Sequence, residues 1–358
     1  MIKKNRCRIN KIVCFLLSIF TVFMFNIIEE NQVFATNSSE IIMEVSTHRI
    51  LDGNNYNQKM YMASTTKILT AITIIENCNL DDKVTVTEKT VGVEGSSIYL
   101  EAGEKLSVKD LLYGLMLRSG NDCAETLAVY CSNTIENFAI LMNQTAKRIG
   151  ANSSNFVNPH GLHDDNHYTS AYDLALISCY AMKNNDFRQI VSTKSIQIPW
   201  TTREYPRVLV NKNKMLKEFE GSTGIKTGFT KKAGRCLVSS SYRNGMELIC
   251  VVLNCPPMFE RSKELLTKAF NEYEMCSIFE SDYIVDFIED NVKQEKIGVI
   301  IKNDIRIPLT KTEKENLILE FDYPKTIDYS IISNKEIGKV NIYSGNNLIF
   351  TEKLFTII

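Results

Sequence analysis

The pattern of apolar and polar positions divides the chain into a mixed part and a strand-rich part. Two short apolar runs near the start, 41–45 and 49–51, read as strands around a polar turn. Several later stretches carry apolar residues every three or four positions, which predicts helices with one buried face. The expected helices cover 64–75, 111–117, 122–129, 135–148, 171–183 and 259–274.

Two further strands, 235–242 and 246–254, flank Asn244-Gly245. That dipeptide favours a tight type I′ hairpin, because both residues tolerate a positive φ. Helices therefore separate a first pair of strands from a last set, and we expect the two sets to meet in one mostly antiparallel sheet with helices packed on it. From about residue 277, short strand-like runs recur between turn residues, which predicts a small all-β domain.

The N-terminus has the three parts of a secretory signal peptide. Five basic residues precede the apolar run 12–25, and small residues around a cleavage point follow at Val33-Phe34-Ala35. The alternative is an uncleaved membrane anchor, but this run of about 14 residues is short for a span of roughly 20. We expect a signal peptide over 1–35, followed by two domains, 36–276 and 277–358.

Length and charge narrow the class of protein further. A chain of 358 residues is too long for one average domain. Its net charge is −1, and loss of the five basic and two acidic residues of 1–35 makes it −4, so nothing indicates nucleic-acid binding. Two of the ten cysteines leave with that segment. Disulfides are permitted outside the cell, but the spacing of the other eight specifies none.

Candidate chemistry begins in the polar stretch 62–67, which leads into an apolar helix. Ser64 would lie at the positive end of that helix, with Lys67 one turn later on the same face. An amine that close can take the hydroxyl proton and activate the serine as a nucleophile. The alternative is a helix cap and a solvated charge, since an isolated S-x-x-K occurs by chance about twice in a chain this long.

Two more triplets strengthen the catalytic interpretation. Ser119-Gly120-Asn121 lies at a helix break, where a hydroxyl and an amide can point into a cleft, and Lys226-Thr227-Gly228 begins an expected edge strand. S-x-N also occurs at 153–155 and 344–346, where we expect turns, whereas S-x-x-K and K-T-G each occur once. The order and separation of the three motifs make the set far more specific than any member.

With these motifs, the sequence resembles the serine D-Ala-D-Ala carboxypeptidases, the low-molecular-weight penicillin-binding proteins, which share their catalytic fold with serine β-lactamases. The likeness covers roughly 40–275, including the Ser-Gly-Asn-Asp and Asn-Pro-His-Gly-Leu stretches, and extends more weakly over the C-terminal β domain. It implies an α+β fold: a β-lactamase/transpeptidase-like domain with an antiparallel sheet, flanking helices and a helical subdomain, then a small β-sandwich-like domain.

The resemblance also implies roles for the motif residues. Ser64 would be the acylated nucleophile and Lys67 its general base. Ser119 would relay a proton to the departing D-alanine, and Asn121 would hold the peptide amide.

The remaining roles concern binding. Lys226 would tune the site and, with Thr227, bind the terminal carboxylate of the substrate. Backbone N–H groups of Ser64 and Phe229, the residue after Gly228, would form the oxyanion hole. Some family members carry histidine at the position of Phe229, so any imidazole role is absent here. Arg261 matches a position that orients the substrate carboxylate, although a surface salt bridge explains it about as well.

A loop rich in histidine and aspartate offers a metal site as an alternative. Its candidate ligands are His160, His163, Asp164, Asp165 and His167. The loop lacks the helical i,i+4 spacing that fixes two histidines on one face. We therefore expect structural loop residues, with no metal and no cofactor.

The sequence as a whole predicts a secreted serine DD-carboxypeptidase that trims the terminal D-alanine from peptidoglycan stem peptides, with β-lactams as covalent inhibitors. A β-lactamase is an alternative, but no E-x-x-x-N arrangement supplies its deacylating base between Asn121 and Lys226. A non-catalytic wall-binding or β-lactam-sensing module is another. We expect an extracytoplasmic protein, secreted or at the outer face of the membrane. No basic amphipathic helix closes the sequence, so we expect either a freely secreted enzyme or one held through an uncleaved N-terminus. Peripheral membrane association is left as an open alternative.

Overall fold

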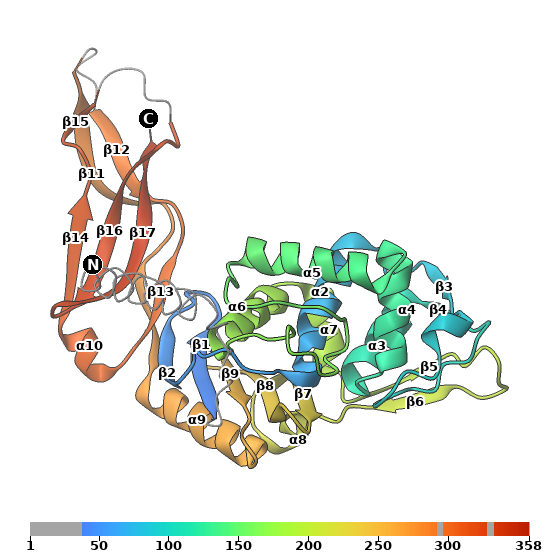
Figure 1. Cartoon of the computed structure of the whole chain (residues 1–358). Coiled ribbons are helices and arrows are strands. Elements are labelled where there is room, and N and C mark those ends of the chain that lie inside the picture. The colour runs from blue at the N-terminus through green and yellow to red at the C-terminus, as the bar shows by residue number, and fades with distance from the viewer. Residues whose placement is uncertain (1–37, 292–295, 328–332, 358) are drawn as a thin grey trace, which may run out of the picture. The chain divides into compact units, whose positions relative to one another are not determined.

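The structure is a computed structural model that describes residues 38–291, 296–327 and 333–357 (Figure 1). The signal peptide expected over 1–35 lies outside these described residues. Within the described ranges, no helix is both long enough and apolar enough to cross a membrane.

A five-stranded antiparallel sheet forms the centre of the first part, in the order β2-β1-β9-β8-β7. Its strands are β1 (Ser39–Glu44), β2 (Ile50–Asn54), β7 (Ser222–Thr230), β8 (Gly234–Arg243) and β9 (Met246–Leu253). Strands from the two ends of this part meet where Ile41 pairs with Val251, which confirms the predicted sheet. Every residue of β9 is buried, because helices cover both faces.

The hairpin between β8 and β9 turns at Asn244 and Gly245, whose φ angles of 50° and 80° confirm the predicted type I′ geometry. β7 is an edge strand as expected, but it begins earlier than predicted. Ser222 already pairs with Ser241, so Lys226 is the fifth residue of the strand and not its first. Pairing across an irregularity near Gly224 produces this longer strand, and the sequence pattern did not show it.

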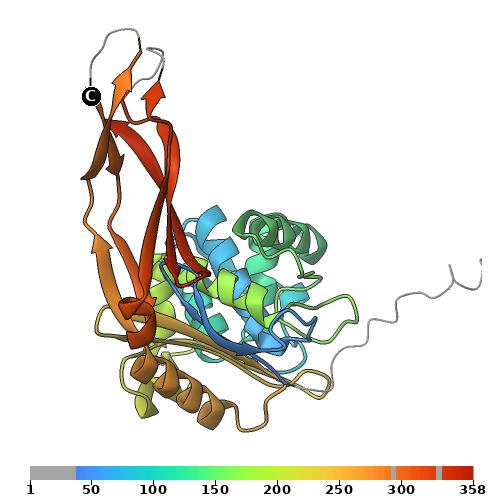
Figure 2. The ribbon, with the colours of Figure 1, turned by 90° about the vertical axis from the view of Figure 1, so that its left-hand side faces the viewer.

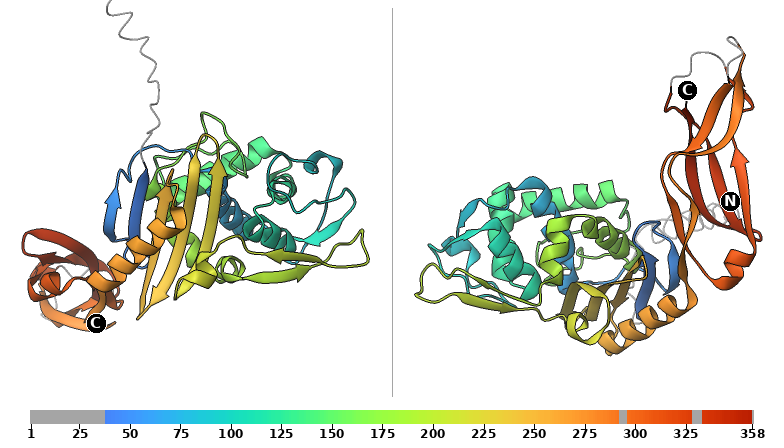
Figure 3. Two further views of the ribbon diagram at one scale, coloured as in Figure 1. Left: turned by 90° about the horizontal axis from the view of Figure 1, so that it is seen from below. Right: turned by 180° about the vertical axis from the view of Figure 1, so that it is seen from behind.

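Helices lie on both sides of the sheet (Figure 3). The larger group on one side consists of α2 (Lys67–Asn77), α3 (Val108–Leu117), α4 (Asn121–Ser132), α5 (Ile135–Ile149), α6 (Ala171–Met182) and α7 (Asn185–Ser192). Each of the other helices in this set packs against α2, which is buried from Lys67 to Ile74, and α6 packs on β1 and β9. α9 (Met258–Glu272) covers the opposite face, where Leu265 and Leu266 are buried.

The sequence pattern gave no bounds for several short elements, because three or four residues carry too little periodicity. They are η1 (Ala63–Thr66), β3 (Lys83–Thr85), η2 (Glu88–Thr90), β4 (Lys105–Ser107), β5 (Ser195–Ile198), β6 (Arg207–Val210) and α8 (Met215–Glu218). The helix expected over 64–75 therefore begins as the tighter turn η1, and α2 starts at Lys67.

The second part is built from strands, as predicted (Figure 2). β10 (Glu274–Phe279) pairs with β13 (Ile305–Leu309), and a six-stranded sheet has the order β14-β16-β17-β12-β11-β15. The strands of that sheet are β11 (Tyr283–Asp290), β12 (Lys296–Ile301), β14 (Leu317–Asp322), β15 (Thr326–Ile327), β16 (Glu336–Ser344) and β17 (Asn347–Ile357). One short helix, α10 (Lys311–Glu315), interrupts the strands and begins with a capping box between Thr310 and Glu313.

Candidate active site

Ser64 and Lys67 lie together at the start of α2. The turn η1 carries Ser64, and the Oγ1 atom of Thr66 donates to the carbonyl of Ala63 at 2.8 Å, which stabilises that turn. Nζ of Lys67 lies 3.1 Å from Oγ of Ser64. Ser64 is partly exposed, whereas Lys67 has no exposed surface. The serine can therefore meet a substrate while the amine beside it stays out of water.

Lys67 joins three segments that are distant in the sequence. Its Nζ atom lies 2.7 Å from Oδ1 of Asn121 and 2.6 Å from the carbonyl oxygen of His160. Burial lowers the pKa of Lys67 well below its ordinary value, and the positive charge of Lys226 lowers it further. The site thus favours a neutral amine next to the serine hydroxyl.

Ser119-Gly120-Asn121 forms the buried turn between α3 and α4. Ser119 has a φ of +65°, a conformation that non-glycine residues adopt rarely and often at functional sites. Both ends of the Asn121 amide have partners. Oδ1 accepts from Nζ of Lys67, and Nδ2 donates to the carbonyl of Glu94 at 2.6 Å. The structure therefore places this motif beside Lys67.

The third motif, Lys226-Thr227-Gly228 of β7, passes directly beside η1, the nucleophile turn that carries Ser64. A Cβ at Gly228 would lie 3.1 Å from the backbone nitrogen of Ser64, closer than ordinary van der Waals contact, so glycine lets β7 pass here without displacing the turn. Lys226 is buried, and its Nζ donates to the carbonyl of Thr227 at 3.0 Å. Burial, followed by the charge of Lys212, lowers the pKa of Lys226 to about 7.

Phe229 lies at the exposed end of the third motif. Its side chain is 61% exposed, and the guanidinium of Arg235 is 5.6 Å from its ring centroid. An apolar ring therefore occupies the place of the histidine that some family members carry.

Arg261 is not brought together with the other predicted residues. It lies on α9, and its guanidinium binds both carboxylate oxygens of Glu40, at 2.6 and 2.9 Å, and one oxygen of Glu264. Glu40 lies two positions before Ile42, which packs against α9, so both side chains leave β1 on that face of the sheet. The structure therefore shows Arg261 in the salt bridge that the sequence left open as an alternative, and its role in substrate binding stays a prediction.

The histidine-rich loop contacts the turn that carries Ser64 through His167. Nδ1 of His167 accepts from the N–H of Val157 at 3.1 Å, and Nε2 lies 2.8 Å from Oγ1 of Thr66. Burial lowers the pKa of His167 to about 3, so the ring is neutral. Nε2 of His160 lies 3.3 Å from a carboxylate oxygen of Glu125. The described residues contain no group of three or more acidic, histidine or cysteine side chains placed to hold a metal ion.

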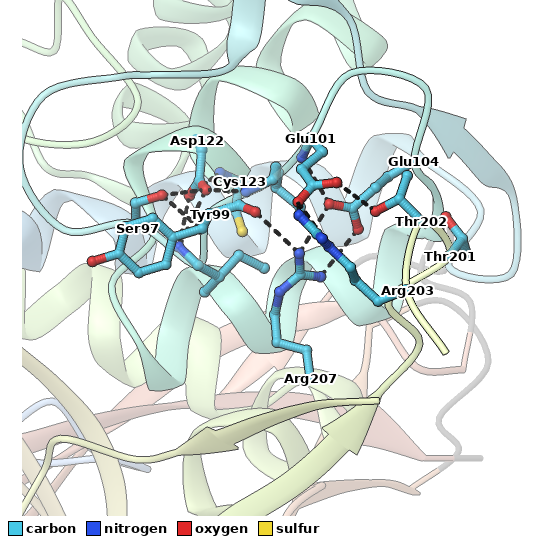
Figure 4. Close-up of polar contacts among 12 residues, drawn as sticks. Ser97, Tyr99, Glu101, Glu104, Asp122, Cys123, Thr201, Thr202, Arg203 and Arg207 are labelled. Carbon is cyan, nitrogen blue, oxygen red and sulfur yellow. Dashed lines mark hydrogen bonds and ion pairs between the residues drawn. The ribbon is translucent and has the colours of Figure 1, made fainter. Parts of the chain in front are cut away.

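Sequence reasoning missed the function of Asp122, whose buried carboxylate organises the loop next to the site (Figure 4). This carboxylate accepts hydrogen bonds from Oγ of Ser97 at 2.6 Å and from the backbone nitrogens of Ile98 and Leu100 at 3.1 and 3.0 Å. In the same loop, the carbonyl of Ser96 accepts a hydrogen bond from the N–H of Asn121. The only signal was that an acidic residue follows the S-x-N motif.

A buried ion pair fixes the other end of that loop (Figure 4). Arg207 of β6 donates to both carboxylate oxygens of Glu104, at 2.9 and 3.1 Å, and to the carbonyl of Tyr99 at 3.1 Å. Lys212 follows β6, and its Nζ donates to Oγ of Ser96 at 3.1 Å. No sequence signal pointed to these residues, because their partners are about 100 positions away.

The fold and the three assembled motifs define a serine enzyme of the penicillin-binding type. A family model described as D-alanyl-D-alanine carboxypeptidase matches residues 27–256, and a model described as penicillin-binding protein 5, C-terminal domain, matches residues 273–357. The chain belongs to the D-alanyl-D-alanine carboxypeptidase family.

Similar proteins carry the same assignment. The D-alanyl-D-alanine carboxypeptidase DacF of Bacillus subtilis is 31% identical over 310 residues, which cover 84% of this chain and 79% of the relative. DacA of Haemophilus influenzae is 30% identical over 356 residues, which cover 92% of this chain and 88% of the relative. The crystal structure of penicillin-binding protein 5 from Haemophilus influenzae matches with a TM-score of 0.80 at 26% identity, covering 89% of this chain and 96% of that one.

Proposed function

We propose that this enzyme removes the terminal D-alanine from peptidoglycan stem peptides through an acyl-enzyme on Ser64. The observation that carries this proposal is the 3.1 Å separation between Nζ of Lys67 and Oγ of Ser64, in a site where the pKa of Lys67 is lowered. A neutral amine at that distance can accept the hydroxyl proton as the serine attacks the carbonyl carbon of the penultimate D-alanine.

The hydrogen bonds of Lys67 fit a neutral amine. A neutral amine has two N–H donors and one lone pair. Oδ1 of Asn121 and the carbonyl of His160 accept the two N–H donors at 2.7 and 2.6 Å, because neither oxygen can donate. The lone pair is then left for the hydroxyl of Ser64. The geometry thus supports Lys67 as the general base.

Stabilisation of the tetrahedral intermediate is assigned to two backbone N–H groups, those of Ser64 and Phe229. Their proximity follows from the close approach of Gly228 to the nucleophile turn. Each such donor contributes about 10²–10³ in rate in comparable acyl-transfer sites. Ser119 relays the proton to the departing amine, and Lys226 with Thr227 binds the terminal carboxylate. Water then hydrolyses the acyl-enzyme.

β-Lactams acylate the same serine in this proposal, because their strained amide resembles the D-Ala-D-Ala bond. Mass spectrometry of the intact protein after penicillin treatment tests it directly. We expect one covalent adduct in the wild type and in Ser153→Ala, an exposed serine in a matching S-x-N sequence, and none in Ser64→Ala. An adduct that persists in Ser64→Ala would falsify the assignment.

The same experiment can be extended to separate the alternatives. A carboxypeptidase releases D-alanine from diacetyl-Lys-D-Ala-D-Ala and keeps its penicilloyl adduct for a long time, whereas a β-lactamase hydrolyses that adduct quickly. A non-catalytic module releases no D-alanine. Family membership does not favour either alternative.

The substrate places the enzyme outside the cytoplasm, where peptidoglycan is built. We propose cleavage after Ala35 and a mature enzyme that is secreted or held at the outer face of the membrane, with domains 36–276 and 277–358. N-terminal sequencing of the protein from fractionated cells tests this location. A mature chain that begins at Thr36 in the medium or wall fraction supports it, and an uncleaved chain in the cytoplasmic fraction contradicts it.

A further inference from the structure

The cysteines of the described part of the chain differ in their surroundings. Six of these eight thiols are buried: Cys123, Cys179, Cys236, Cys250, Cys255 and Cys276. Cys78 and Cys131 are partly exposed, and their side chains are hydrogen-bonded to each other. Two thiols that touch each other and can be reached from solvent are candidates for joint chemistry.

The two cysteines lie at the ends of adjacent helices. Cys78 is the C-cap residue of α2, and its backbone is extended there, with φ −130° and ψ 149°. Cys131 is in the last turn of α4, which packs against α2. Beside them, Oη of Tyr130 donates to Oδ2 of Asp82 at 2.8 Å, which links the end of α4 to the segment after Cys78. The fold therefore holds the two thiols together from positions 53 residues apart.

We propose that Cys78 and Cys131 form a disulfide that links the C-terminal ends of α2 and α4. The sequence alone did not specify a disulfide, since neither cysteine belongs to a C-x-x-C motif. The oxidising compartment in which the bond forms rests on the proposed extracytoplasmic location. The capacity of the pair to form it does not, and it can be tested on purified protein.

The chemistry requires an oxidant, for which we assign a disulfide, either a small molecule or a thiol–disulfide oxidoreductase. The thiolate of Cys131 attacks the oxidant disulfide and forms a mixed disulfide, and the first oxidant thiol leaves. Cys78 then loses its proton to solvent and attacks Sγ of Cys131, which expels the second thiol. The two cysteines lose two electrons and two protons, and the oxidant is reduced to two thiols.

The order of attack follows from the environment of each thiol. The hydrogen bond from Cys78 lowers the pKa of Cys131 to about 7 and raises that of Cys78. A thiol with a pKa near the ambient pH is the most effective attacking group. Closing the bond moves the two sulfur atoms from hydrogen-bond contact to about 2.05 Å.

The disulfide would stabilise the helical layer that holds the active site. It closes a loop of about 50 residues, which removes entropy from the unfolded chain. Lys67 begins α2 and Asn121 begins α4, so the bond lies at the opposite ends of both helices from the site. We therefore expect a gain in stability with little change in kcat/KM at 25 °C.

The test uses the purified full mature chain, reduced with dithiothreitol or oxidised with excess glutathione disulfide. Peptide mapping after alkylation should find one cross-link, between Cys78 and Cys131. The midpoint of thermal unfolding should be about 5–10 °C higher in the oxidised protein. Cys78→Ser and Cys131→Ser should show equal midpoints in both states, whereas Cys276→Ser, which keeps the pair, should retain the difference.

Two outcomes would overturn the proposal: a protein that stays fully reduced under excess oxidant, or a cross-link that joins any other pair of cysteines. Neither depends on D-alanine release or penicillin binding, so failure here is distinguishable from failure of the proposed function. If a serine variant does not fold, alkylation of the folded wild type still decides, because oxidation should protect these two thiols and no others.

Discussion

Nζ of Lys67 lies 2.7 Å from Oδ1 of Asn121, although the two residues are 54 positions apart in the chain. This contact joins the first motif to the second and orients the amine that faces Ser64. The resemblance implies that Asn121 holds the peptide amide of the substrate, whereas here its amide oxygen accepts from Lys67. Asn121 therefore positions the base in the free enzyme, before any peptide is present.

Lys67→Ala should lower the rate of acylation by about 10²–10⁴-fold, the usual contribution of a general base. The reason is that its amine, with a lowered pKa, is the group hydrogen-bonded to the nucleophile. Stopped-flow or quenched-flow measurement of penicillin acylation gives this rate. Lys89→Ala removes an exposed lysine and should have no effect. Equal acylation rates in wild type and Lys67→Ala would contradict the assignment.

Lys226 should make substrate binding depend on pH. Its pKa is lowered to about 7, so its positive charge is present at pH 6 and lost as the pH rises through 7. We expect KM for a peptide ending in D-Ala-D-Ala to rise above pH 7, because the substrate carboxylate loses its charged partner. Lys226→Arg stays charged and should flatten this rise. A wild-type KM that is constant between pH 6 and 9 would be inconsistent with this role.

Asp122→Asn should loosen the loop beside the site. The carboxylate accepts several hydrogen bonds, and an amide must present donors to some of the same N–H groups. A loss of about 1–3 kcal/mol in the free energy of unfolding is expected, with slower acylation because the loop also holds Asn121. Urea denaturation and penicillin acylation measure the two effects. Asp81→Asn, on the surface, is the matched control, and it should change neither quantity.

Arg207→Met should destabilise the enzyme by about 3–5 kcal/mol, because it leaves the carboxylate of Glu104 buried without its partner. The double variant Arg207→Met with Glu104→Leu should recover much of this loss, since the uncompensated charge is then absent. Arg203→Ala breaks the exposed pair with Glu101 and should leave the urea midpoint unchanged. A double variant as unstable as the single one would argue against this explanation.

Gly161→Ala should impair both folding and acylation. Gly161 has a φ of +85°, and a Cβ there would lie 1.9 Å from the carbonyl oxygen of Ala63, beside Ser64. Gly150→Ala is the matched control, because its φ is +97° but nothing lies within 4 Å of the added atom. The control should lose only about 1–2 kcal/mol from its backbone conformation. Thermal unfolding and penicillin acylation are measured for both variants. A larger loss in Gly161→Ala than in Gly150→Ala reports the steric clash, because both variants share the backbone strain.

The sequence by itself determined most of the elements and the three motifs. The helical periodicity of 135–148 and 171–183 and the Asn244-Gly245 turn depend on local interactions, and the structure confirms them. The pattern of short strands predicted after residue 277 is also local, and the structure confirms it. A pattern of this kind is readable because its physical cause lies within a few residues along the chain.

Only the tertiary structure decided which distant groups meet. The sequence showed Arg261 at a family position, but a bidentate contact with Glu40 holds it on the α9 face of the sheet. It gave no sign that Arg207 pairs with Glu104, or that Cys78 meets Cys131. Burial of Lys67 and Lys226 also needed the fold, because desolvation depends on every layer that surrounds a side chain. Pairing and burial are properties of the packed chain, and no short stretch of sequence contains them.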